Sequence, residues 1–137
     1  MKSIKLNTKT KQSLARMGVI AVYAFGSRVQ NTAHAGSDLD LGIVVKNPQR
    51  AFNDFLEFNH RIYSVLSEVF PDNLKLDISY LQTANPALGM AAVRYGRVIF
   101  ETDPRLRADF EEELFKRYLD YQPLQRAYEE ANFAAFV

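Results

Sequence analysis

The stretch Val19-Ile20-Ala21-Val22-Tyr23-Ala24-Phe25-Gly26-Ser27 decides how this chain folds. A near-continuous apolar run of strand length that ends at a glycine predicts a β-strand buried on both faces. Residues 26–37 are small and polar, which predicts a loop. Residues 38–45 then alternate between apolar and other side chains, which predicts a second strand. Because only a loop separates the two strands, we expect them to pair in an antiparallel or mixed sheet.

The remaining sequence adds helices and two further strands to this pair. We expect helices at residues 7–17, 49–70 and 86–95, strands at residues 74–80 and 97–100, and two C-terminal helices over residues 104–137, the second opening at Pro123. This order predicts an α/β (α+β) fold, in which helices pack on a small mixed β-sheet. The length of 137 residues fits one domain, residues 1–137.

Composition narrows the class of protein. Seventeen basic and sixteen acidic residues give a net charge of +1, which argues against direct nucleic-acid binding as the main role. The absence of cysteine excludes disulfides and Cys-based zinc sites. No apolar run approaches 18 residues and no signal peptide is apparent, so we expect a cytoplasmic protein without a membrane span.

Three aspartates are the candidate metal ligands and catalytic residues. Asp38 and Asp40 are two positions apart on a predicted strand, so their carboxylates project from the same face. Asp77 lies between Leu76 and Ile78 and belongs to the polar face of the third strand. If the second and third strands are neighbours, three carboxylates converge. Carboxylate oxygens suit Mg²⁺, and two such ions about 3.5–4 Å apart stabilise phosphoryl displacement.

The residues after the first strand are candidates for nucleotide binding. Gly26 allows a sharp turn and a close approach of the backbone to a ligand. Ser27 offers a hydroxyl and a backbone N–H to a phosphate, and Arg28 either makes a bidentate contact or lies in solvent. His34 lies in the same loop, but Mg²⁺ prefers oxygen ligands, so a solvated histidine is the expected role.

The sequence resembles a known family at these positions. Gly26-Ser27, ten intervening residues and Asp38-Leu39-Asp40 are similar to the Gly-Ser-x10-Asp-x-Asp signature of the polymerase-beta-like nucleotidyltransferases. The small size resembles the minimal nucleotidyltransferase (MNT) group, many of which are antitoxins of HEPN–MNT toxin–antitoxin pairs. The resemblance covers about residues 19–103, with Asp77 in the place of the third carboxylate. Residues 94–101 are similar to the end of the MNT domain.

The resemblance implies a nucleotidyltransferase fold and a reaction. Asp38, Asp40 and Asp77 would hold two Mg²⁺ ions, and Asp77 would help to deprotonate the acceptor hydroxyl. Gly26 and Ser27 would hold the β- and γ-phosphates of ATP, so that AMP is transferred and pyrophosphate leaves. In MNT antitoxins the acceptor is a tyrosine of the cognate HEPN ribonuclease, which implies a HEPN toxin as partner.

Two other functions stay open at this point. A nucleotidyltransferase for a small acceptor would resemble the kanamycin-modifying enzymes, which carry an additional helical domain. A binding module could neutralise a toxin by contact alone, although such a module has no physical need for three converging carboxylates. The apolar end, residues 133–137, offers a surface for docking in a homo- or hetero-oligomer.

Overall fold

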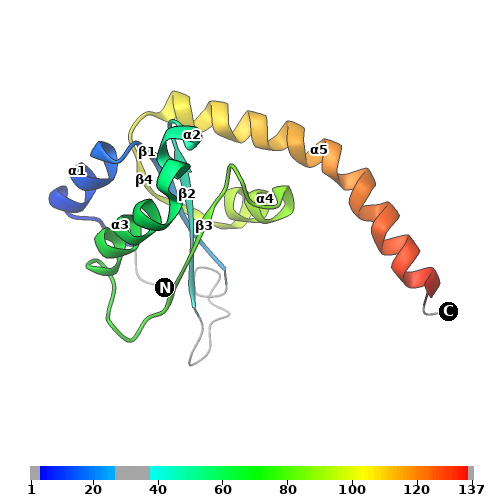
Figure 1. The fold of residues 1–137 in the computed structure, drawn as a ribbon, viewed down its shortest axis with the longest axis horizontal. Coiled ribbons are helices and arrows are strands. Elements are labelled where there is room, and N and C mark those ends of the chain that lie inside the picture. The colour runs from blue at the N-terminus through cyan, green and yellow to red at the C-terminus, as the bar shows by residue number, and fades with distance from the viewer. Residues whose placement is uncertain (1–3, 27–37, 136–137) are drawn as a thin grey trace.

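The computed structural model describes residues 4–26 and 38–135, and its centre is a four-stranded mixed sheet (Figure 1). The strands are β1 (Val19–Phe25), β2 (Leu39–Val45), β3 (Leu76–Tyr80) and β4 (Arg97–Glu101), in the order β3-β2-β1-β4. β1 is antiparallel to both β2 and β4, whereas β2 and β3 are parallel. The predicted mixed sheet is therefore confirmed. Ser27, Arg28 and His34 lie outside the described residues.

Helices cover both faces of the sheet (Figure 1). They are α1 (Thr8–Arg16), α2 (Pro48–Ala51), the 3₁₀ turn η1 (Phe52–Asp54), α3 (Phe55–Ser67), α4 (Pro86–Tyr95) and α5 (Pro104–Ala135). Side chains of β2 alternate between two apolar clusters: Leu41 and Ile43 pack with Phe58 and Ile62 of α3, and Val44 belongs to the cluster of α4 and α5. This alternation is the period of two that the sequence displays.

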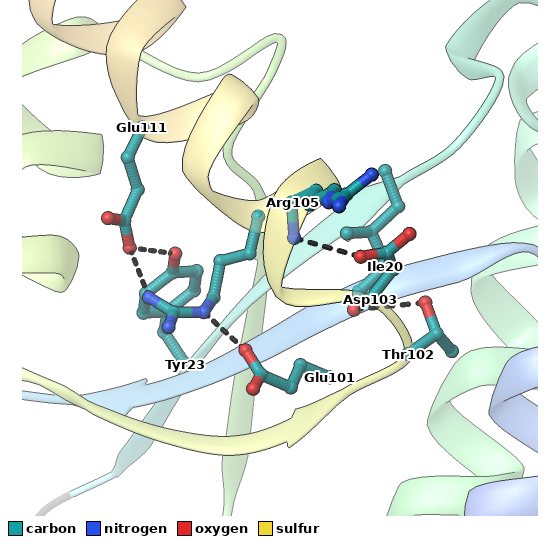
Figure 2. Close-up of polar contacts among 8 residues, drawn as sticks. Ile20, Tyr23, Glu101, Thr102, Asp103, Arg105 and Glu111 are labelled. Atoms are coloured by element: carbon teal, nitrogen blue, oxygen red, sulfur yellow. Dashed lines mark hydrogen bonds and ion pairs between the residues drawn. The ribbon is translucent and has the colours of Figure 1, made fainter.

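Polar side chains cap the first turns of α1, α4 and α5. Asn7 accepts the backbone N–H of Thr10 at 2.8 Å and opens α1. Asn85 accepts from Ala87 at 2.8 Å and opens α4, with a proline in the first turn. Asp103 accepts from the backbone N–H of Arg105 at 2.9 Å at the start of α5 (Figure 2). Each cap satisfies an N–H that the helix itself cannot pair.

The single helix predicted over residues 49–70 is wrong, because the segment is broken into α2, η1 and α3. Asp54 interrupts it with φ −122° and ψ 85°, and its side chain accepts the backbone N–H of Glu57 as the cap of α3. The break places the centre of the Phe52 ring 5.0 Å from the centre of the Tyr80 ring and 5.9 Å from the centre of the Phe58 ring. Aromatic packing and a new cap offset the lost helical hydrogen bonds.

The two C-terminal helices are also a wrong prediction, since α5 continues through Pro123 as one helix of 32 residues. A proline has no N–H, so the carbonyl of Leu119 loses its helical partner. Leu119 is 49% exposed, and water is therefore available at this position. Ending one helix and starting another would leave more backbone groups unpaired than this one bond. No helix within the described part of the chain is long and apolar enough to cross a membrane.

Candidate active site

The strand register brings two of the predicted acids side by side. Asp40 of β2 pairs with Asp77 of the parallel strand β3 on one side and with Phe25 of β1 on the other. Partners in register project from the same face of a sheet, so both carboxylates lie on the α4 and α5 face, and that of Asp40 lies next to Gly26. The predicted condition, that the second and third strands are neighbours, is confirmed.

Asp40 lies in an environment that disfavours its charge. Burial raises the pKa of the Asp40 carboxyl, and the repulsion and hydrogen bonding of Asp77 raise this pKa further. The charge of Asp38, which directly precedes β2, acts in the same direction. Like charges at close range favour the protonated form unless a cation neutralises them.

Both the backbone conformation of residue 26 and the nearby side chain of Asp40 favour a glycine at this position. Its φ of +89° lies in the left-handed region that favours glycine. A Cβ at this position would collide with the carboxylate of Asp40. The glycine predicted to end β1 therefore also makes room for the acid on the adjacent strand.

Gly96 lies in the turn between α4 and β4, close to the end of β1 that precedes Gly26. A Cβ at Gly96 would lie 2.8 Å from the carbonyl oxygen of Ala24 and 3.0 Å from the Cβ of Phe25. Nearby, the guanidinium of Arg94 lies 5.7 Å from the centre of the Tyr118 ring and links α4 to α5. Gly96 therefore allows the turn between α4 and β4 to approach the end of β1 closely.

The donor set fits a hard divalent cation, although the carboxylates are not gathered on one point. Within residues 4–26 and 38–135, no three His, Cys, Asp or Glu side chains converge tightly enough to hold one ion. Asp40 and Asp77 are partners in register, and Asp38 directly precedes β2. All three offer only carboxylate oxygens, and a divalent cation would relieve the repulsion that raises the pKa of Asp40.

A polar network that the sequence did not predict holds α5 to the sheet (Figure 2). The hydroxyl of Tyr23 in β1 donates to Glu111 of α5 at 2.6 Å. Arg107 donates to the same carboxylate at 2.9 Å and also pairs with Glu101 at the end of β4. Burial and Glu111 raise the pKa of Tyr23 well above its ordinary value. The signal available in the sequence is a single hydroxyl inside the apolar run of residues 19–25.

Comparison with known families identifies the chain. A family model described as Polymerase beta, Nucleotidyltransferase matches residues 8–105, well over half of the 137 residues. This chain belongs to the polymerase beta nucleotidyltransferase family. The match includes Gly26 and all three aspartates, and it begins before and ends after the region of resemblance at residues 19–103. The chain is therefore a nucleotidyltransferase domain. No curated protein sequence matches it.

Solved structures share the nucleotidyltransferase fold of this chain. A chain in a toxin–antitoxin structure with AMP-PNP has a TM-score of 0.64 and 21% identity, covering 93% of this chain and 99% of that chain. A chain from an MntA-HpeT toxin–antitoxin mutant gives the same four values. A chain from the tri-AMPylated Shewanella oneidensis HEPN toxin in complex with its MNT antitoxin has a TM-score of 0.52 and 18% identity, covering 96% and 100%.

Proposed function

We propose that this nucleotidyltransferase transfers AMP from ATP to a tyrosine hydroxyl of a cognate HEPN toxin and thereby acts as the antitoxin. The observation that carries the proposal is the pairing of Asp40 with Asp77, with Asp40 against Gly26, in a chain of this family. Support for the substrate and acceptor comes from the solved neighbours, one with AMP-PNP and one with a tri-AMPylated HEPN toxin.

Different residues of the site bind the phosphates, accept the proton and hold the metal. The backbone at Gly26, the hydroxyl of Ser27 and the guanidinium of Arg28 bind the β- and γ-phosphates and leave the α-phosphorus open to attack. The acceptor oxygen forms a bond to that phosphorus, its proton passes to the exposed carboxylate of Asp77, and the bond to pyrophosphate breaks. Mg²⁺, when held by the three aspartates, would supply neutralisation of the phosphate charge.

The outer half of α5 supports a protein acceptor. This half extends beyond the sheet and the other helices (Figure 1). Leu124, Tyr128 and Phe133 are 69%, 70% and 73% exposed there. Tyr121, Leu124 and Tyr128 are spaced three and four residues apart, so they continue one face of the helix. An exposed apolar helix face is typical of a protein-binding surface.

Label transfer tests the proposal. The chain and its proposed HEPN partner, sought among the products of neighbouring genes, are incubated with ATP labelled at the α-phosphate, with and without Mg²⁺. We expect label on a toxin tyrosine only with Mg²⁺, and a loss of at least about 100-fold in the Asp40→Asn variant. Asp109→Asn is the matched control, because this exposed aspartate on α5 is far from Asp40 in the sequence and outside the site.

Three outcomes would contradict the proposal. Undiminished transfer by a variant carrying both Asp38→Asn and Asp40→Asn would exclude the assigned acids. Full neutralisation of the toxin by the same variant, without label on the toxin, would show that contact alone is sufficient. Label on a small hydroxyl compound but not on the toxin would instead identify a small-acceptor enzyme.

A further inference from the structure

A pocket of about 660 Å³ lies at the end of the sheet opposite the three aspartates. Val19, the first residue of β1, pairs with Val45, the last residue of β2, at this end. The pocket is lined by the ends of α1 and β2 and by the segment of α2, η1 and α3, and its apolar lining includes Met17, Val45 and Phe58. The seven residues of β1 separate this end from Gly26 by about 20 Å. The volume is within the usual range of about 300–1,000 Å³ for small-molecule sites.

The charges that line this pocket are mainly positive. Four cationic side chains come from four successive segments: Arg16, Lys46, Arg50 and Arg61. Only two acidic side chains, Asp54 and Glu57, accompany them. Within the described part of the chain, no ion pair involves any of these six side chains. The Asp54 carboxylate is already engaged, because it accepts the backbone N–H of Glu57 at 3.2 Å.

Hydrogen bonds fix the backbone of the part of the pocket lining that Gly18, Val45 and Lys46 form. The side-chain amide of Gln82 donates to the carbonyl of Val45 and accepts its N–H, both at 2.8 Å, as a neighbouring strand would. The N–H of Lys46 donates to the carbonyl of Gly18 at 2.8 Å. Nothing lies within 4 Å of where a Cβ of Gly18 would be, so the backbone there borders open space. A preformed site avoids the cost of ordering its walls on binding.

We propose that this pocket binds a nucleotide-sized organic phosphate with at least two negative charges. The four cations can contact separate phosphate oxygens, and arginine does so with two parallel hydrogen bonds. Met17, Val45 and Phe58 offer apolar surface to the uncharged part of the ligand. A concentration of cations in a chain whose net charge is only +1 favours a specific anion site over general polyanion binding. The site is separate from the proposed active site and does not depend on its function.

Amide NMR with ADP as the probe tests this proposal. The experiment uses the full chain with EDTA, which removes divalent ions from the aspartates. We expect ADP to shift the amides of Gly18, Lys46, Asn47 and Arg50, and inorganic phosphate to bind at least tenfold more weakly than ADP. Binding should also weaken as salt is added, because the contacts are ionic.

Charge-reversal variants provide the second part of the test. The pair Arg50→Glu and Arg61→Glu should weaken ADP binding at least tenfold. The matched pair Arg105→Glu and Lys116→Glu changes the net charge by the same amount at exposed positions of α5. Its affinity for ADP should stay within twofold of that of the unmodified protein. Lys46→Gln, at an exposed position, serves if the first pair fails to fold, and it should weaken binding at least threefold.

Several results would overturn the proposal. Amide shifts confined to the Gly26 and Asp40 end would place ADP in the active site only. Equal losses in the two charge-reversal pairs would indicate attraction by overall charge. Binding of a short RNA at these amides without any shift by ADP would make the surface a nucleic-acid site instead.

Discussion

Asp40 holds its carboxylate where burial and two neighbouring acids oppose the charge. A folded-state pKa raised above the ordinary value means that the protonated form is favoured in the fold. The stability that this form contributes is present at low pH and is lost as pH rises through the raised pKa. At neutral pH without metal, the charged side chain therefore costs stability.

Replacing Asp40 with asparagine removes that charge and should stabilise the metal-free protein. We expect the melting temperature at pH 7 in EDTA to rise by a few degrees, as about 1 kcal/mol produces in a chain of this size. Added Mg²⁺ should stabilise the native protein more than the variant. Thermal denaturation with and without Mg²⁺ measures both effects, and a variant that melts below the native protein in EDTA would contradict the explanation.

Gly26→Ala tests the contact between the two strands. The variant must adopt a positive φ and also place a Cβ against the Asp40 carboxylate, so we expect it to lose about 2–4 kcal/mol of unfolding free energy and most transferase activity. Gly18→Ala is a matched control, because its φ is +80° and its Cβ would meet nothing within 4 Å. It should lose only about 1–2 kcal/mol. Equal losses in chemical denaturation would exclude the proposed collision.

Tyr23 links stability to alkaline pH through its hydroxyl. Because its pKa is raised in the fold, the neutral form is stabilised, and this contribution declines as pH rises above about 10, the ordinary tyrosine value. Tyr23→Phe should cost about 1–2 kcal/mol at pH 7 and should reduce the loss of stability between pH 9 and 11. Urea denaturation at both ends of this range provides the measurement. The matched control Tyr63→Phe removes a half-exposed hydroxyl and should leave the free energy of unfolding at pH 7 nearly unchanged.

At the scale of elements, α5 has an inner half that packs and an outer half that does not. Phe110 and Leu114 are buried against the domain, whereas Leu124 and Tyr128 are about 70% exposed. Deleting residues 124–137 should therefore change the free energy of unfolding by less than about 0.5 kcal/mol. Deleting from residue 117 onwards should be clearly destabilising, since it removes Arg117, which donates to the carbonyls of Leu81 and Gln82. Denaturation of both truncations distinguishes the two halves.

Across the whole molecule, local stability should decrease from the central strand β1 to the outer end of α5. β1 is buried throughout and has a hydrogen-bonded neighbour on each side, so its amides should exchange most slowly with solvent. Amides of α5 beyond Pro123 should exchange fastest among the helices, because few tertiary contacts hold them. Hydrogen exchange on the isolated chain measures this order. Strong protection beyond Pro123 would mean that the outer helix is already covered, for example by a second copy.

Local patterns in the sequence were sufficient to predict the strands and to place Asp40 and Asp77 on two of them. The apolar run before Gly26 and the alternation after Asp38 each report burial over a few neighbouring residues, and the structure has strands at both. Asp77 could be assigned to a polar face but not to a neighbour of Asp40, since pairing joins residues 37 positions apart. The family resemblance, not the strand pattern, pointed to that neighbour.

The features that sequence reasoning missed depend on tertiary contacts. Asp54 has the chemistry of a cap, but only the packing of Phe52 against Tyr80 reveals why the helix breaks there. Pro123 normally ends a helix, and the cost is tolerable here because its surroundings are exposed. The partners Tyr23 and Glu111 are 88 positions apart, so no local pattern connects them.

The parallel register of β2 and β3 also restricts which insertions and deletions this gene can tolerate. Adding one codon within β3 just before Asp77 would move that side chain to the face of α1 and α3, because side chains alternate along a strand. The same addition in the turn that precedes β3 could be absorbed as a longer loop. Length variation among descendants of this sequence should therefore accumulate between Ser67 and Leu76 and be absent between Leu76 and Tyr80.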